Sequence, residues 1–441
     1  MYVGTAGAAV GLGSIWRFPY LAGTGGGSAF ILMFVLACLL IATPLLAAEL
    51  ALGRRSRRSP PRAAGAVALA AGLSSRWNAI GILGCLAGFV GFSYYTVIAG
   101  WVLAYAWKCA AGDVSAAGPA HVAEIWHAFR SESFEVGTWH AAFVALVIVI
   151  SARGLQRGIE AANAIRGPAL LLILLLLAAY SLATGDVSRG LSFAFAPNFA
   201  ALNAKVALAA VGQAFYATGV GQALMIAYGA YVERGTSLVR ASVVTSAAIL
   251  LVSLLATIMI FPLVFRYGMN PAQGPELVFE VLPRVFAEMP AGRVIGSLFF
   301  TLLVLAALMP SIALLEPTVA WLTERIRLSR AAAVVAAGIS AWFLGLGSVL
   351  SFGPWSTWHP LGILALFADK TFFDLSDYVM SNIMLPMGAI LTSVFLGWRL
   401  NRAFIDDELA ESSPSARRAC RWLLRWVCPL AIIAISVANF L

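Results

Sequence analysis

Charged residues are scarce in this chain. Lys, Arg, Asp and Glu together make up 11% of its 441 residues, whereas roughly a quarter of the residues of an average soluble domain are charged. A chain with so few charges has too little polar surface to cover a water-facing shell. The composition therefore argues against a soluble globular enzyme.

Cysteine and histidine are also rare, with five and four residues respectively. The cysteines show no paired spacing and lie mostly within apolar runs, so neither a disulfide framework nor a metal knuckle is indicated. No basic segment precedes the first apolar run, and we therefore expect no cleavable signal peptide.

Long apolar runs are what the chain has in abundance. Hydrophobic residues make up 61% of it, in runs of about twenty residues, the length that crosses roughly 30 Å of hydrocarbon. Counting the runs predicts an all-α membrane protein with eleven spans, centred near Gly11, Leu39, Tyr95, Leu146, Leu174, Thr218, Leu254, Leu308, Ala337, Pro386 and Ile432. Residues 274–290 are too polar and proline-rich to span, and we interpret them as an outer re-entrant or hairpin loop.

The net charge of +9 comes from arginines that cluster on alternate loops, after the second, fourth, sixth, eighth and tenth runs. Loops rich in Lys and Arg stay in the cytoplasm. This pattern predicts a multi-pass protein of the plasma membrane, the inner membrane in bacteria, with a cytoplasmic N-terminus. The charge thus indicates orientation in a lipid bilayer and no nucleic-acid partner.

Glycines interrupt two of the predicted spans, at residues 8–14 in the first and 217–222 in the sixth. Irregular backbone at membrane depth is tolerated only where it lines a cavity or is buried in protein. The two breaks are equivalent if spans one to five and six to ten are repeats, which predicts a transport site near the bilayer midplane. The alternative is that these glycines only allow helices to pack closely.

A specific motif surrounds the first break. Residues 7–20 read GAAVGLGSIWRFPY, followed by three glycines at 25–27. This stretch resembles the first-helix motif of the neurotransmitter:sodium symporter family. Further matches are AELALGR at 48–54, SYY at 93–95, GQAFY at 212–216 and DLSDY at 374–378. The resemblance covers nearly the whole chain and implies the LeuT-type fold, a 5+5 inverted repeat with broken helices 1 and 6.

The implied boundaries divide the chain into two five-helix repeats and a tail. The first repeat covers residues 1–183, an outer connection 184–203, the second repeat 204–400 with an outer loop at 268–291, and a cytoplasmic loop with helix 11 covers 401–441. The implied function is secondary active transport of a small amino acid or similar zwitterion by alternating access.

The resemblance also implies a substrate site at the breaks. Free N–H groups at broken helix ends favour an anion, so Ala9, Gly11, Gly13 and the Tyr95 hydroxyl would hold a substrate carboxylate. The side-chain pocket is implied to comprise Gly91, Phe215, Tyr216, Thr218, Gly219 and Gln222. Monoamine carriers place an aspartate where this chain has Gly11, so we expect a substrate that brings its own negative charge. Gln222 predicts a more polar pocket than a leucine site.

Two implied gates flank this site. Arg17 and Asp377 resemble the outer gate, closing with Gln213 over a lid formed by Phe215 or Tyr216. The alternative for the charged pair is snorkelling near a helix end. Tyr231 and Glu324 match the inner gate, but the family's basic and tryptophan partners would precede Met1. Either the sequence starts late or its cytoplasmic closure differs.

The sodium sites implied by the resemblance are where the chain departs most from the family. Their positions fall on Gly7, Ala9, Val10, Ser14, Ala217, Ile249, Ala306, Met309 and Pro310. Sodium takes oxygen ligands, yet of the side-chain ligand positions only Ser14 keeps a hydroxyl. We therefore expect weakened or absent sodium coupling, with Met309 filling the vacated space and Ser311 a substitute ligand only if the helix slips. Na+ remains the ion that the family implies, and no organic cofactor is expected.

Several alternatives stay open. The carrier could be proton-coupled, through Glu49 and Glu316, or uncoupled, or it could bind a solute without moving it. Both carboxylates could equally be structural bridges between helices. A channel would need a filter loop or charged rings, and an enzyme would need a catalytic constellation; neither pattern is visible in the sequence.

Overall fold

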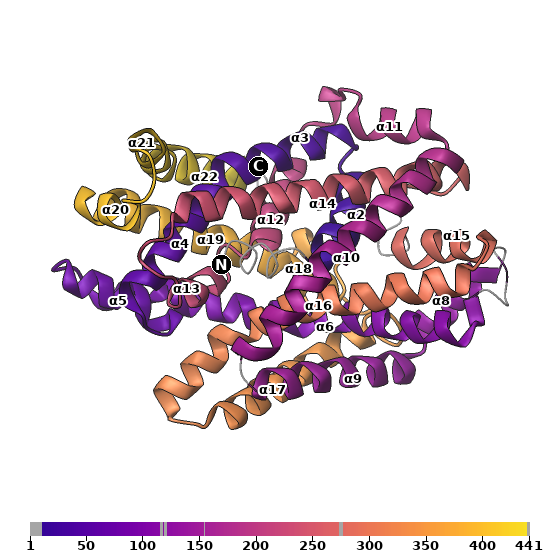
Figure 1. Cartoon of the computed structure of the whole chain (residues 1–441), viewed down its shortest axis with the longest axis horizontal. Helices are drawn as coiled ribbons and strands as arrows, with labels where there is room; N and C mark the ends of the chain where they lie inside the picture. Colours follow the sequence, from indigo (N-terminus) through magenta and orange to yellow (C-terminus); the bar gives the residue numbers. More distant parts are fainter. Residues whose placement is uncertain (1–10, 115–117, 119–120, 154, 273–276, 439–441) are drawn as a thin grey trace.

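In the computed structural model of this chain, residues 11–114, 118, 121–153, 155–272 and 277–438 are described, and every regular element in these ranges is a helix (Figure 1). The elements are η1 (Gly13–Arg17), α2 (Phe18–Thr24), α3 (Ser28–Ala37), η2 (Cys38–Ala42), α4 (Thr43–Ser56), α5 (Pro60–Ala70), η3 (Ser75–Asn78), α6 (Ala79–Ala111), α8 (Val122–Ser131), α9 (Ser133–Ala152), α10 (Leu155–Thr184), α11 (Val187–Phe195), η5 (Phe199–Ala201), α12 (Ala204–Thr218), α13 (Leu224–Gly229), α14 (Leu238–Arg266), η6 (Leu277–Val281), α15 (Leu282–Glu288), α16 (Gly292–Ile326), α17 (Arg330–Leu350), η7 (Ala365–Phe367), α18 (Phe372–Tyr378), η8 (Val379–Met384), α19 (Leu385–Val394), η9 (Phe395–Arg399), α20 (Arg402–Glu408), α21 (Pro414–Trp422), η10 (Leu423–Val427) and α22 (Cys428–Ala438).

Most of the expected spans appear as long apolar helices. Eight helical segments of the described chain are long and apolar enough to cross a membrane, and a ninth arises if α10 and α11, bent by 119° at their junction, count as one span. The two remaining expected spans are those centred near Gly11 and Thr218. They are the two whose helices the sequence predicts to be interrupted, and the count of eleven stays a prediction.

The predicted break in the sixth span is observed. Helix α12 ends at Thr218 and α13 begins at Leu224. Between them Gly219, Gly221 and Ala223 have φ of +75°, +79° and +57°. Glycine enters this left-handed region without steric cost, unlike other residues. The two glycines therefore allow the chain to leave the helix and re-enter it within five residues.

The first span is irregular in its described part. Residues 7–10 lie outside the described ranges, so the break there is followed only from Gly11. The Ser14 amide donates to the Gly11 carbonyl at 3.2 Å, and the widened turn η1 then leads directly into α2. Such π-type turns are frequent at functional sites because they displace backbone groups from the regular helix pattern.

The interrupted helices are enclosed by longer ones. Helix η1 packs against α14, α12 against α3, and α13 against α4, while α6 and α16 pack along each other. The described part of the proline-rich segment between α14 and α16 contains η6 and α15, both too short to span. The arrangement places the irregular backbone inside a helical bundle, with the ends of α5, α20 and α21 on one side of the molecule (Figure 1).

We predict that Gly221→Ala destabilises the protein more than Gly72→Ala does. Both glycines have positive φ, so each alanine costs about 1–2 kcal/mol of backbone strain. At Gly221 the added carbon would also lie 2.8 Å from the Leu385 carbonyl oxygen, whereas nothing lies within 4 Å at Gly72. Thermal unfolding of the two variants in detergent should show the larger drop for Gly221→Ala; equal melting temperatures would contradict the tight approach of the break to α19.

Candidate functional site

A small cavity lies where the interrupted helices meet α6 and α16. Its cavity volume is about 30 Å³, and it is lined by Gly11, Gly13, Tyr95, Tyr216, Ala217, Gly219, Gln222, Leu224, Pro310 and Leu314. Six of these, Gly11, Gly13, Tyr95, Tyr216, Gly219 and Gln222, are residues that the resemblance implied for substrate binding. The fold thus brings the two glycine-rich breaks and a tyrosine from α6 to one place.

The cavity has a polar and an apolar part. Glycine backbone, two tyrosines and the Gln222 amide supply polar groups, while Leu224, Leu314 and the Pro310 ring supply apolar surface. The Gln222 side chain donates to the Tyr216 carbonyl at 3.3 Å, so a backbone group of the same span holds its orientation. A largely apolar pocket with a few placed polar groups is typical of small-molecule sites.

Gly11 has no room for a side chain. A β-carbon there would lie 2.5 Å from Cγ of Pro310 and 3.4 Å from the Tyr95 hydroxyl. The first distance is shorter than side-chain carbons ever approach, so even alanine would require α16 or the break to shift. An aspartate at this position is therefore excluded by Pro310.

Of the other implied substrate residues, the three that the structure describes do not line the cavity. The Met380 methyl group takes the space beside Gly91, since a β-carbon at Gly91 would lie 2.6 Å from it. The Thr218 hydroxyl donates to the Ala214 carbonyl of its own helix at 2.7 Å, and Phe215 is buried in the packing. Ala9 lies outside the described residues. Substrate contacts by these four remain predictions.

The structure brings Arg17, Gln213 and Asp377 together. Arg17 is only 4% exposed. One of its terminal nitrogens lies 2.8 and 3.0 Å from the two Asp377 carboxylate oxygens and 3.0 Å from the Ser381 hydroxyl. The other donates to the Gln213 side chain at 2.5 Å. We call these four residues the Arg17 gate. So little exposure argues against snorkelling, which keeps the charged head in water.

The Arg17 gate closes directly over the cavity. The Arg17 guanidinium lies 4.7 Å from the centre of the Tyr216 ring, which lines the cavity. The Gln213 amide donates to the Gly13 carbonyl at 2.9 Å and so ties α12 to η1. Of the two residues expected as the lid, Tyr216 is therefore the one that separates the gate from the cavity.

Two residues that bond Asp377 were absent from the sequence-based set. The Tyr94 hydroxyl donates to Asp377 at 2.9 Å, and Ser381 bonds both Asp377 and Arg17. A signal existed for each. Tyr94 lies within the SYY motif, and Ser381 follows Asp377 by four residues, which places both side chains on one face of the α18–η8 helix.

The two residues expected at the inner gate, Glu324 and Tyr231, lie in different surroundings. The Glu324 carboxylate accepts hydrogen bonds from Arg62 at 2.9 Å and from the Ser59 amide at 3.2 Å, at the start of α5. Tyr231 is 70% exposed. Arg62 is thus a basic partner of Glu324, and the role of Glu324 in an inner gate stays a prediction. Arg62 was missed because its distance in sequence from Glu324 gives no sign of contact.

The implied sodium positions are mostly closed by apolar packing. Ala217, Ile249, Ala306 and Met309 are buried, and the Pro310 ring lies beside Gly11. That Met309 fills the vacated space stays a prediction. The Ser311 hydroxyl donates to the Ala307 carbonyl of its own helix at 2.9 Å. The Ser14 hydroxyl is buried and has no partner among the described residues. Gly7, Ala9 and Val10 lie outside the described ranges.

Glu49 and Glu316 differ in their surroundings. Both oxygens of Glu316 accept hydrogen bonds from Arg330, at 2.9 and 2.8 Å, which bridges α16 and α17. One oxygen of Glu49 accepts from the Gly221 amide at 2.7 Å, and the other has no partner in the described chain. Glu49 therefore supports the break in the sixth span, and Glu316 acts as a helix bridge.

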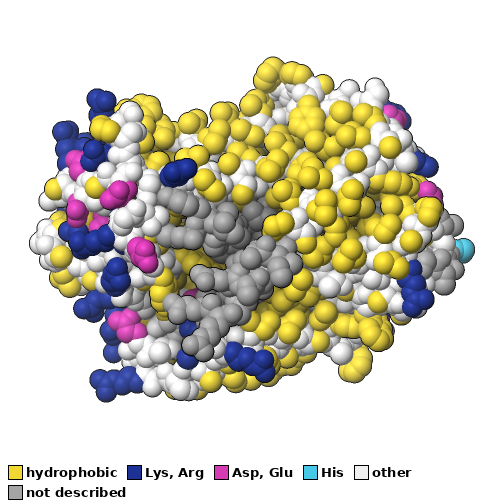
Figure 2. Space-filling view, in the orientation of Figure 1, with side chains coloured by type: hydrophobic (Ala, Val, Ile, Leu, Met, Phe, Trp, Pro, Cys, Tyr) yellow, Lys and Arg dark blue, Asp and Glu magenta, His cyan; other side chains and the backbone are white. Residues whose placement is uncertain are grey.

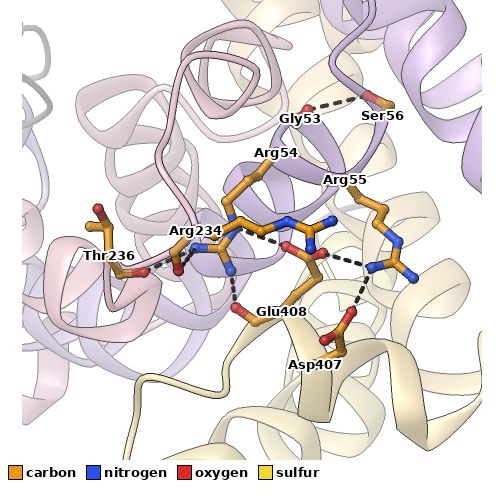
Figure 3. Close-up of polar contacts among 8 residues, drawn as sticks. All are labelled: Gly53, Arg54, Arg55, Ser56, Arg234, Thr236, Asp407 and Glu408. Atoms are coloured by element: carbon orange, nitrogen blue, oxygen red, sulfur yellow. Dashed lines mark hydrogen bonds and ion pairs between the residues drawn. The ribbon is translucent and has the colours of Figure 1, made fainter.

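A further polar network lies at the end of α4 (Figure 3). Buried Arg54 donates to the Glu408 carboxylate at 2.8 Å and to the Thr236 carbonyl at 3.0 Å, and Arg55 contacts Asp407 at 2.5 Å. These contacts tie α4 to α20 and to the loop between α13 and α14. Arg54 ends the AELALGR motif, but its partners are too distant in sequence to be predicted from that motif.

Comparison with known proteins adds a family and a fold. Residues 2–125 and 135–439 match the sodium:neurotransmitter symporter family. The chain is 34% identical to the uncharacterized sodium-dependent transporter YhdH of Bacillus subtilis, over 98% of this chain and 94% of that protein. It is 31% identical to an uncharacterized sodium-dependent transporter of Haemophilus influenzae, over 98% and 95%. The crystal structure of MhsT in complex with L-phenylalanine is 35% identical and superposes with a TM-score of 0.92, covering 100% of this chain and 98% of that one.

We predict unequal costs for breaking the two ion pairs of this site. Asp377→Asn leaves buried Arg17 without its charge partner and should lower the free energy of unfolding by about 2–3 kcal/mol, because an uncompensated buried charge is expensive. Glu324→Gln breaks a pair whose side chains are 28% and 38% exposed and should cost less than about 1 kcal/mol. Denaturation of both variants tests this order, and a reversed order would contradict the burial of the Arg17 gate.

Proposed function

The chain belongs to the sodium:neurotransmitter symporter family, a family of membrane transporters with the LeuT-type fold, and from this membership we propose that it carries a small amino acid across the membrane by alternating access. The observation that carries the proposal is the cavity between the two interrupted helices. Its walls present backbone at membrane depth, where peptide groups need a polar partner.

The chemistry of the lining favours a zwitterion. None of the ten lining residues is acidic or basic, so no side chain there neutralises a lone ammonium group. Peptide N–H groups at the first break and the Tyr95 hydroxyl suit a carboxylate, and an amino acid brings both charges itself. The complex of MhsT with L-phenylalanine supports this substrate class.

Substrate size is set by the apolar side of the cavity. Leu224, Leu314 and the Pro310 ring would face the substrate side chain, while Gln222 leaves one polar wall. Met380 occupies the space beside Gly91. We therefore propose a small or medium-sized side chain, with limited polarity tolerated near Gln222.

The distribution of basic residues supports an orientation. Lys and Arg side chains gather at the end of the molecule formed by α5, α20 and α21, whereas a broad hydrophobic band covers the middle (Figure 2). Arginine-rich ends stay in the cytoplasm. On this basis the Arg17 gate faces outward, the N-terminus is cytoplasmic, and the membrane is the plasma membrane.

The proposed transport has a weak requirement for sodium. A hard cation needs several oxygen ligands, whereas Ala217, Ile249, Met309 and Pro310 offer none from their side chains. The Pro310 ring contacts Gly11 directly, so α16 is packed against the described part of the first span. Named relatives are sodium-dependent, which makes the ion requirement of this chain the point to measure.

We predict that amino acids raise the melting temperature of the purified protein nearly equally in sodium and in potassium buffer. A ligand that binds only the folded state stabilises it by about 2.7 kcal/mol at a hundred times its dissociation constant. Uptake of the best ligand into proteoliposomes should be saturable. Uptake that rises steeply with sodium and is absent in choline buffer would contradict the weak sodium requirement. Saturable binding of the amino acid without uptake would contradict transport.

The double variant Met309→Thr with Pro310→Ser should gain sodium dependence. It restores two hydroxyl groups beside the Ala306 carbonyl, where a cation would be bound. The matched control, Met309→Leu with Pro310→Ala, removes the proline without adding oxygen. We expect the melting temperature of the first variant, but not of the control, to rise with sodium; the same response in both would exclude these positions as a cation site.

A further inference from the structure

A surface groove lies at the arginine-rich end, between the start of α14 and the start of α21. It is lined by Gly235, Ser237, Val239, Arg240, Val243, Val244, Glu411, Ser412, Ser413 and Ala416. The hydroxyl groups of Ser237 and Ser412 lie 2.9 Å apart and hold its two walls together. The groove is separate from the cavity at the interrupted helices and shares no residue with it.

One wall of the groove belongs to a longer exposed stripe of α14. Arg240, Val243, Val244, Ala247 and Leu251 are all exposed, and their spacing of three and four residues places them on one helix face. From Arg240 to Leu251 the stripe is about 16 Å long at 1.5 Å per residue. That is close to half of the roughly 30 Å hydrocarbon thickness, the depth of one leaflet.

The apolar part of this stripe faces lipid. Helix α14 is one of the helices long and apolar enough to cross the membrane. Val243, Val244 and Leu251 are 48%, 39% and 51% exposed. On a membrane-spanning helix, exposed apolar side chains contact lipid acyl chains. The stripe therefore runs from hydrocarbon, at Leu251, up to the arginine at the head of the groove.

The head of the groove has the chemistry of a phosphate acceptor. Arg240 and three serines supply donors there, and Glu411 is the one acidic residue among the lining side chains. The flanking segments carry further arginines, at 234, 417 and 418. Basic clusters beside membrane helices attract anionic lipid head groups. The arginines at the head of the groove and the apolar stripe of α14 therefore both fit a phospholipid.

We propose that this groove binds one anionic phospholipid, with its phosphate at Arg240 and the serines and one acyl chain along Val243, Val244 and Leu251. The bound lipid bridges α14 and α21 across the groove. The site is independent of the transported solute and of the coupling ion.

The test compares two lipids with identical acyl chains on the detergent-purified full chain. Phosphatidylglycerol should raise the melting temperature in a saturable way, and phosphatidylcholine should not. Arg240→Gln should raise the half-saturating concentration of phosphatidylglycerol at least fivefold. Val244→Trp, which fills the groove, should abolish the response; if that variant does not fold, Arg240→Gln still decides.

Matched controls separate this site from general lipid contact. Arg76→Gln removes another exposed arginine outside the groove, and Val335→Trp enlarges a lipid-exposed valine of α17 that is 41% exposed. Both should keep the wild-type response. Equal shifts from the two lipids, an equal loss in Arg76→Gln, or an equal shift from inorganic phosphate alone would overturn the proposal.

Discussion

The structure depends on how peptide groups are satisfied where the sixth span is interrupted. Away from water, each unpaired N–H or C=O costs several kcal/mol, and between Thr218 and Leu224 the helix ladder does not pair them all. The Gly221 amide donates a hydrogen bond to the Glu49 carboxylate, and the Gln222 side chain donates one to the Tyr216 carbonyl. The cavity beside Gly219 is where a solute can complete the pairing. The positions of the glycines, the cavity and the closing tyrosine all follow from this requirement.

The two ion pairs expected at the gates differ in burial and therefore in strength. On one side buried Arg17 binds Asp377, Gln213 and Ser381 and lies over Tyr216. On the other, Glu324 and Arg62 form a partly exposed pair, which water screens. In the alternating access that we propose, one side opens at a time, and this difference would make the closed Arg17 gate the harder of the two pairs to separate.

The sequence predicted the fold class and the position of the break, because apolar run length and glycines inside a run are local signals. The motifs also placed Arg17, Gln213 and Asp377 in one gate although 360 residues separate the charged pair. Packing was not predictable in this way. That the Pro310 ring lies beside Gly11, that Met380 fills the space at Gly91, and that Arg62 pairs with Glu324 each depend on how distant helices approach, for which a single sequence carries no signal.

The central claim is that the irregular backbone of the two interrupted spans binds the transported solute. A cryo-electron microscopy map of the protein, saturated with the amino acid that stabilises it most, tests this directly. We expect ligand density in the cavity, with its carboxylate against the Gly11 to Gly13 backbone and the Tyr95 hydroxyl. A continuous sixth helix through residues 219–223, or a ligand bound elsewhere with this cavity empty, would contradict it.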